Sequence, residues 1–358
     1  MPEKHLPQLD GLRGVAILIV LLGHIASRPI GLNIGWIGPL PPLGVDLFFV
    51  LSGFLITGVL LRAKGKPHFF RNFYARRVLR IAPLYYALLI FMFGIAHNRW
   101  VPFSFGNNDL KWWAFALYIQ NLYQKNLGPM TIGLTWSLAI EEQFYTVWPW
   151  LVSKLTVRGV SIAAAVLVVV GPVARQVFPH YGWDTYVNPL CRIDAMAMGA
   201  LVSLWIFAIS PSAQQIRKKA LVVAACVVAL AVVTHMIGGS QALNKSIVAG
   251  AFTGMLMLSL AWVPLSKALS IAPLRETGKL SYCLYLVHPS VGSVLFYEMG
   301  GGDLRTRLLR SFLLLTLSYL IAYLSWRFFE SPILSLKRYF ESAKPTKPAE
   351  ATEVACAL

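Results

Sequence analysis

Two ionisable residues lie inside the first apolar segment of the chain, and their spacing places them on one side of a helix. Arg13 and His24 are eleven positions apart in the string GLRGVAILIVLLGHIASRPI. At about 100° per residue they are roughly 20° apart around a helix and about 16 Å apart along its axis. Ionisable side chains are costly inside a bilayer and normally face a polar cavity. The pair predicts a polar stripe, with a cation near one membrane face and an imidazole deeper in.

His24 is a candidate general base. A neutral imidazole in apolar surroundings can accept a proton, and a nearby carboxylate would fix its tautomer and stabilise the imidazolium. Glu141 and Glu142 are the candidate carboxylates. Adjacent residues point about 100° apart around a helix, so we do not expect both to face His24. The alternative role for a single membrane histidine is an interhelical hydrogen bond.

A cluster of arginines in RNFYARRVLR (71–80) could bind phosphate. Arg77 and Arg80 are three positions apart and share a helix face, and the planar guanidinium group binds phosphate oxygens bidentately. Arg76 belongs to the same cluster. The alternative is ordinary anchoring at the cytoplasmic face, where arginines meet lipid phosphates.

The composition is typical of a membrane protein. Of the 358 residues, 57% are hydrophobic and only 13% are charged. The net charge of +17 would suggest a nucleic-acid partner in a soluble chain, but here much of it falls in loops between apolar runs, so we expect membrane lipids and no nucleic acid. The four cysteines have no paired spacing, and no zinc-ligand spacing occurs, so neither a disulfide framework nor a metal site is predicted.

Ten segments are long enough to cross a bilayer. They lie at about 11–30, 44–61, 81–97, 137–153, 160–178, 192–209, 220–237, 246–264, 280–298 and 309–330. The aromatic stretch 111–124 is shorter and interrupted by Gln120 and Asn121, so we expect an interfacial or re-entrant piece.

The distribution of Lys and Arg sets the orientation. With the N-terminus in the cytoplasm, twenty Lys and Arg fall inside and ten fall outside or near the outer ends, which is the expected cytoplasmic excess. An eleventh span at 111–124 would reverse every later loop. The predicted fold is therefore all-α: a polytopic membrane protein of about ten transmembrane helices with both termini cytoplasmic. Residues 1–335 form one membrane-embedded domain, and 336–358 form a polar, disordered cytoplasmic tail.

In this topology the charges sort by depth. The inner mouth collects Arg13, Arg76, Arg77 and Arg80, whereas the outer half holds His24, Asp46, Glu141 and Glu142. We expect an aqueous passage that is basic at the cytosol and leads to the buried imidazole.

Three further motifs have less specific meanings. Ser52 and Gly53, in VDLFFVLSGFLIT, favour close helix packing. His288, which precedes Pro289, favours a structural hydrogen bond or a kink over catalysis. Glu330 is expected to be a partner for an inner arginine.

Taken together, seven strings resemble the acyltransferase 3 family of bacterial membrane enzymes, typified by O-antigen and exopolysaccharide acetylases. The resemblance covers about residues 6–335. The strings are LDGLRGVAILIVLLGH (9–24), GVDLFFVLSGFLIT (44–57), FYARRVLRIAPLYY (73–86), TWSLAIEEQFYTVWP (135–149), RIDAMAMGAL (192–201), LSYCLYLVHP (280–289) and FFESP (328–332).

The resemblance implies roles for individual residues. Arg13 and His24 match the family's first-span Arg and His, and Arg77 and Arg80 match its Arg-x-x-Arg. Its Trp-Ser-Leu-x-x-Glu-Glu string is matched at 136–142. More distant relatives keep an acid at the first of the two Glu positions, so Glu141 is favoured over Glu142 as the partner of His24. Some relatives carry a soluble domain after the last span, and its absence here implies a stand-alone enzyme.

The implied activity is O-acyl transfer in the bacterial cytoplasmic (inner) membrane, as part of polysaccharide biosynthesis. The donor would be acyl-CoA, by default acetyl-CoA, held by Arg13, Arg76, Arg77 and Arg80; the acceptor would be the hydroxyl of a carbohydrate or a lipid-linked glycan. His24 would act as the base or through a transient acyl-His24, and Glu141, Glu142 and Asp46 are the candidate acids. Two alternatives stay open: transfer to a lipid or small molecule, and a transporter or anion-binding or lipid-binding protein without chemistry.

Overall fold

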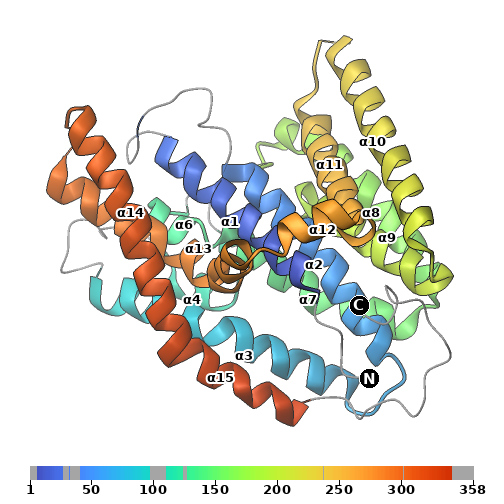
Figure 1. The fold of residues 1–358 in the computed structure, drawn as a ribbon, viewed down its shortest axis with the longest axis horizontal. Coiled ribbons are helices and arrows are strands. Elements are labelled where there is room, and N and C mark those ends of the chain that lie inside the picture. The colour runs from blue at the N-terminus through green and yellow to red at the C-terminus, as the bar shows by residue number, and fades with distance from the viewer. Residues whose placement is uncertain are drawn as a thin grey trace.

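The computed structural model describes residues 6–26, 32, 41–96, 110–123, 127–236, 238–300 and 302–340, and every regular element within these ranges is a helix (Figure 1). The long helices are α1 (Pro7–Ala26), α2 (Pro41–Ala63), α3 (Phe69–Leu89), α7 (Trp136–Lys154), α8 (Val157–Val177), α9 (Ile193–Ile209), α10 (Ala213–Met236), α11 (Gln241–Ala261), α13 (Ala272–Met299) and α14 (Leu304–Ser325). The shorter α-helices are α4 (Trp112–Ala116), α5 (Gln120–Tyr123), α6 (Met130–Gly133), α12 (Val263–Leu269) and α15 (Ser331–Ser335). The remaining 3-10 and π turns are η1 (Ile90–Ala96), η3 (Phe178–Tyr181), η4 (Pro189–Cys191), η5 (Trp326–Glu330) and η6 (Leu336–Phe340).

Each predicted span corresponds to one of the long helices, which confirms the all-α, polytopic membrane fold. Among the described residues, eight helical stretches are long and apolar enough to cross a membrane by length and composition. The other two predicted spans are α7, which carries two glutamates, and α9, which has 17 residues. Both contact α2 and α8. These contacts place α7 and α9 against other helices. A helix that packs against protein can be shorter or more polar than a helix that faces lipid.

Two boundaries differ from the expectation. The helix that contains the third span begins at Phe69, not near 81, because the arginine-rich segment before the apolar run continues the same helix. Residues 336–340, assigned from the sequence to the tail, form η6 against α3. The rest of the predicted tail, 341–358, lies outside the described residues.

The aromatic stretch 111–124 is folded against α3 and α7. Its described residues form the short helices α4 and α5. Tyr85 of α3 donates to the carbonyl of Phe115 at 3.0 Å, and Gln143 of α7 donates to the carbonyl of Tyr118 at 2.7 Å. Helices of five and four residues cannot cross a bilayer, so this stretch is not a span.

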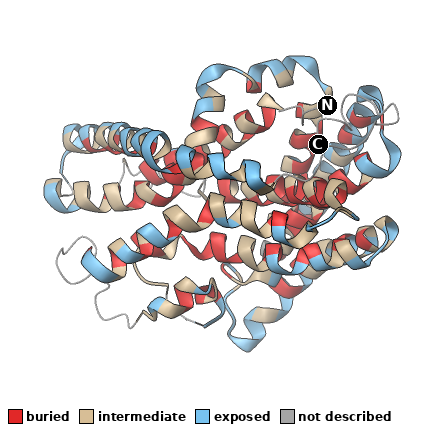
Figure 2. Cartoon of the chain, turned by 90° about the horizontal axis from the view of Figure 1, so that it is seen from below, coloured by how far each residue is buried: buried red, intermediate tan, exposed pale blue. Residues whose placement is uncertain are grey.

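The central helices form a row in the order α14, α13, α1, α2, α9 and α8, in which each helix contacts the next. Helix α11 packs across α2, α8 and α9, and α10 packs on α11 (Figure 1). Figure 2 shows that buried residues concentrate in the middle of the molecule and exposed ones on the outward faces of the peripheral helices. The outward residues of α8 and α10 are largely valine, leucine and alanine, as expected of lipid-facing surfaces.

Helices α1 and α13 approach so closely that their glycines cannot carry a side chain. A Cβ at Gly278 would overlap the carbonyl oxygen of Asp10, and a Cβ at Gly14 would overlap that of Leu274. Small residues are a common means of close helix packing in membranes, because dispersion contacts rather than water expulsion drive association there. Ten positions beyond Gly14 lies His24, and ten beyond Gly278 lies His288, so this parallel contact brings the two histidines to the same level.

Helices α2 and α9 use the same device. A Cβ at Gly53 would overlap the carbonyl oxygen of Met196, and a Cβ at Gly199 would overlap that of Val50. The expected packing role of Gly53 is therefore confirmed.

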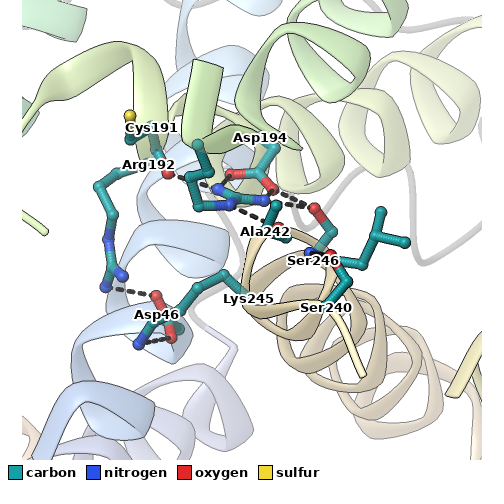
Figure 3. A network of polar contacts seen from close by, with 10 residues as sticks. Asp46, Cys191, Arg192, Asp194, Ser240, Ala242, Lys245 and Ser246 are labelled. Carbon is teal, nitrogen blue, oxygen red and sulfur yellow. Dashed lines mark hydrogen bonds and ion pairs between the residues drawn. The ribbon is translucent and has the colours of Figure 1, made fainter. Parts of the chain in front are cut away.

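A buried ion pair joins α8, α9 and α11 (Figure 3). Arg175 donates to both carboxylate oxygens of Asp194, at 3.1 and 2.8 Å, and to the carbonyl of Ala242 at 2.7 Å. Ser246 of α11 donates to the same carboxylate at 2.6 Å. A buried charge is tolerated only when it is paired and hydrogen-bonded, so the network fixes the mutual position of the three helices.

We expect Gly278→Ala to lower the melting temperature of the purified protein in detergent, because the added methyl group forces α1 and α13 apart. The cost of such overpacking is about 1–3 kcal/mol. Gly94→Ala is the matched control, because a Cβ at Gly94 meets nothing within 4 Å. Equal melting temperatures for the two variants would contradict the close packing.

Asp194→Asn should destabilise the fold strongly, because it leaves the Arg175 guanidinium without a counter-charge in a buried site. Breaking a buried pair in this way costs about 3–5 kcal/mol. Glu276→Gln is the control, since it removes the partner of Lys279 from an ion pair whose side chains are 57% and 38% exposed. Melting curves should separate the two variants clearly; a control that unfolds as early as Asp194→Asn would show that burial is not the cause.

Candidate active site

A cavity lies where α1, α2, α3, α7 and α13 meet, and three arginines line it. Arg13 comes from α1, whereas Arg77 and Arg80 come from one face of α3. The sequence analysis assigned these residues to the donor, and the structure brings them together. Arg76 does not line the cavity among the described residues, although its charge, like those of Arg77 and Arg80, acts on Lys337 in η6.

The cavity carries more positive charge than the nearby carboxylates compensate. Asp10 lies 3.9 Å from Arg13, and within the described ranges no carboxylate is within ion-pair distance of Arg77 or Arg80. The guanidinium of Arg77 lies 5.2 Å from the centre of the Tyr145 ring. Among charged neighbours, Arg13 acts most strongly on Arg80. Converging like charges of this kind are suited to binding an anion with several phosphate oxygens.

Glu141 also lines the cavity, whereas Glu142 does not among the described residues. The carboxylate of Glu141 accepts a hydrogen bond from Ser52 of α2 at 2.7 Å. The cations whose charges act most strongly on it are Arg77 and Arg13. The structure thus places Glu141 with the arginines, as an anionic part of the same wall, and gives Ser52 a role besides packing.

His24 contacts a second histidine. His288 Nε2 lies 3.3 Å from His24 Nδ1, and the ring centres are 5.0 Å apart. Both side chains are buried, with 7% and 1% of their surface exposed. The carbonyl of Val20 lies 2.9 Å from His24 Nδ1, and that of Leu284 lies 2.8 Å from His288 Nδ1. The structural hydrogen bond expected of His288 is therefore present. Its partners are the carbonyl of Leu284 and the ring of His24.

The histidine pair lies behind the cavity wall. His24 is not among the described residues that line the cavity, so the expected continuous passage from Arg13 to His24 stays a prediction. The connection runs through Tyr285, which lines the cavity and whose ring centre lies 6.2 Å from that of His288. The hydroxyl groups of Tyr285 and Ser137 are 2.7 Å apart, and both residues line the cavity.

Asp46 lies in a separate ion-pair network. Its carboxylate is 2.6 Å from Arg192, which directly precedes α9, and 3.8 Å from Lys245 of α11 (Figure 3). Arg192 in turn lies over the rings of Phe49, Trp136 and Tyr186. These contacts account for the burial of Asp46, and Asp46 does not line the cavity in the described part of the chain.

Sequence reasoning missed the tyrosines of α13 and the contact of His288 with His24. Tyr282, Tyr285 and His288 are spaced by three positions and so share one face of the helix. That face borders the cavity through the two tyrosines and reaches His24 through the histidine. A polar stripe at this spacing inside an apolar span was the available signal, since such residues normally face the interior of the bundle. No group of three or more His, Cys, Asp or Glu among the described residues is arranged to hold a metal ion.

Comparison with known proteins gives relatives of one kind. The chain is 29% identical to the peptidoglycan O-acetyltransferase OatA of Listeria monocytogenes, over 92% of this chain and 56% of that protein. It is 28% identical to the O-acetyltransferase OatA of Staphylococcus aureus, over 92% of this chain and 57% of that protein. A shorter match, 36% identical over 41% of this chain and 24% of the relative, is to the putative peptidoglycan O-acetyltransferase YrhL of Bacillus subtilis.

The chain spans little more than half the length of the two OatA proteins. No solved structure matches. A family model described as an acyltransferase domain matches residues 6–327. This match agrees with the seven strings from which the resemblance was predicted, and it extends over nearly the whole chain. The chain therefore belongs to the acyltransferase 3 family of membrane proteins.

Proposed function

We propose that the protein is an O-acetyltransferase that moves an acetyl group from acetyl-CoA to a carbohydrate hydroxyl. The family and the names of the relatives support acetyl transfer and a glycan acceptor. The observation that carries the proposal is the convergence of Arg13, Arg77 and Arg80 on a cavity whose far wall adjoins the buried pair of His24 and His288. With both termini in the cytoplasm, the arginine end of the cavity faces the cytosolic pool of acyl-CoA.

The donor would bind through its phosphates. Acetyl-CoA is a polyanion with a long flexible arm that ends in the thioester. Arg13, Arg77 and Arg80 hold the phosphates. Glu141 keeps the cluster from carrying its full positive charge and holds α2 to α7 through Ser52. The arm then extends along α1 toward His24.

The chemical step would take place at His24. We assign the reaction to Nε2, because Nδ1 faces the carbonyl of Val20 at 2.9 Å. Nε2 takes the proton of the acceptor hydroxyl as its oxygen attacks the thioester carbonyl carbon. The tetrahedral intermediate then expels the CoA thiolate, which receives the proton from the imidazolium. A transient acetyl group on Nε2 uses the same nitrogen and stays open as an alternative route.

The proposal requires the cavity to open at Tyr285. Tyr285 lines the cavity and its ring centre lies 6.2 Å from that of His288, so we expect this side chain to move when the thioester reaches His24. Binding of the donor arm would supply the energy for that movement.

The reaction itself is tested with purified protein in lipid nanodiscs and acetyl-CoA labelled on the acetyl group. We expect CoA release that depends on added envelope glycan, and glycans that gain mass in units of one acetyl group. Mass spectrometry of envelope glycans from cells with and without the protein identifies the acceptor. Specific transport of an anion in proteoliposomes, without acetyl transfer, would instead support the alternative class.

His24→Ala should lower acetyl transfer by about 10²–10⁴-fold, the usual contribution of general acid–base catalysis. Binding of acetyl-CoA should stay close to that of the unchanged protein. Transfer is compared per amount of folded protein, because the loss of a buried side chain also lowers the melting temperature. His235→Ala is the control, because His235 is exposed in the last turn of α10. Transfer by His24→Ala at a near-normal rate would exclude His24 as base and as acyl carrier.

Arg77→Gln should weaken acetyl-CoA binding by about 10–100-fold, since one charge-assisted hydrogen bond contributes about 1.5–3 kcal/mol. Arg71→Gln removes the same charge from an exposed position of the same helix and should change the Kd little. Equilibrium binding at two salt concentrations checks both variants. Equal losses in the two would mean that general surface charge, rather than the cavity, attracts the donor.

A further inference from the structure

We infer that His288 is the positioning residue for His24: it accepts a hydrogen bond from His24 Nδ1 and thereby fixes the lone pair of the neutral ring on Nε2. The sequence suggested a carboxylate for this task, and Glu141 was the favoured one. The inference rests on the proposed function for its catalytic consequence, but its structural content stands on the histidine pair alone.

The protonation of His288 follows from its surroundings. A carbonyl oxygen only accepts hydrogen bonds, so the nitrogen facing the carbonyl of Leu284 at 2.8 Å carries a hydrogen. Pro289 has no N–H, which leaves the carbonyl of Tyr285 without its intrahelical donor, and this carbonyl also acts on the ring of His288. The contact with Leu284 places the hydrogen on Nδ1. Nε2 of the neutral ring is therefore an acceptor.

His24 supplies the matching donor. Its Nδ1 faces the carbonyl of Val20 at 2.9 Å and Nε2 of His288 at 3.3 Å. A hydrogen on His24 Nδ1 can be shared between these two acceptors, the carbonyl of Val20 and Nε2 of His288. A hydrogen on Nε2 of His24 instead would leave the lone pair of Nδ1 pointing at a carbonyl oxygen and at a second lone pair. That arrangement is repulsive in a buried site, where an unmade hydrogen bond is costly.

The backbone holds the pair in place. The close contact at Gly14 and Gly278 sets the distance between α1 and α13, and both histidines lie ten positions further along. His288 is 1% exposed, so neither water nor lipid competes for its Nε2. When His24 takes up a proton, the resulting imidazolium keeps two acceptors on Nδ1 and presents its second N–H at the site of reaction.

Nitrogen NMR tests the tautomer without reference to any activity. Protein labelled with ¹⁵N in its histidines is measured in liposomes, and the His24 signals are identified as those absent from His24→Gln. The expected result is a protonated Nδ1 and an unprotonated Nε2 in the neutral ring. The opposite tautomer in the unchanged protein would overturn the inference, whatever the fate of the proposed reaction.

Two substitutions of His288 separate positioning from packing. A glutamine side chain carries its amide oxygen as many bonds from Cα as a histidine carries Nε2, so His288→Gln retains an acceptor for His24. His288→Asn, with a shorter side chain, retains only a donor toward Leu284. We expect kcat in His288→Asn to fall by about 10–100-fold, with the KM for acetyl-CoA within about twofold, and His288→Gln to recover at least about a tenth of the normal kcat.

In His288→Asn, only the carbonyl of Val20 remains of the two acceptors that face His24 Nδ1, so the fraction of His24 with its hydrogen on Nδ1 should fall. In His288→Gln this fraction should stay as in the unchanged protein. If the two variants instead lose kcat equally and show the same His24 signals as the unchanged protein, His288 only packs and the inference is wrong. If neither the variants nor the unchanged protein transfer acetyl groups while the NMR result holds, the proposed function fails and the histidine pair stands.

Discussion

The backbone contact between α1 and α13 sets the geometry on which the site depends. Gly14 and Gly278 let the two parallel helices approach until a single added carbon would overlap a carbonyl oxygen. In lipid, such proximity gains dispersion contacts that a wider separation would forfeit. Arg13 and His24 both lie on α1, and His288 lies on α13. The contact between these two helices therefore sets the position of Arg13 at the cavity and the distance between His24 and His288. A wider spacing would separate the histidines before it disturbed any arginine of α3.

Buried charges in this protein are of two kinds. Arg175 with Asp194, and Arg192 with Asp46, are matched pairs whose hydrogen bonds fasten α2, α8, α9 and α11 to one another. The cavity arginines lack such matching, since within the described ranges no carboxylate lies within ion-pair distance of Arg77 or Arg80. In a low-dielectric interior, unmatched cations are unfavourable unless a ligand completes the set. The same residue type thus serves cohesion in the matched pairs and, in the proposed function, binding in the cavity.

The sequence predicted the helices and the arginine cavity because both depend on local patterns. Apolar runs locate the helices, and the spacing of Arg77 and Arg80 puts them on one face. It did not predict the partner of His24, which depends on how two spans 264 positions apart pack together. Glu141 was an attractive candidate from charge alone, but the fold turns it toward Ser52. Asp46 was a candidate acid because the sequence does not show its ion-pair partners. These partners, Arg192 and Lys245, are far from it in the sequence.

A neutral histidine beside the proposed base has a physical advantage over a carboxylate. Acetyl transfer from a thioester releases a thiolate, and the donor already carries several phosphates. An acid against His24 would place a further negative charge near that thiolate, and like charges repel strongly where water is excluded. His288 orients the ring by its lone pair without adding charge, so the imidazolium is less stabilised and returns its proton to the leaving sulfur more readily. Glu141 remains beside Arg77 and Arg13, where its charge is useful.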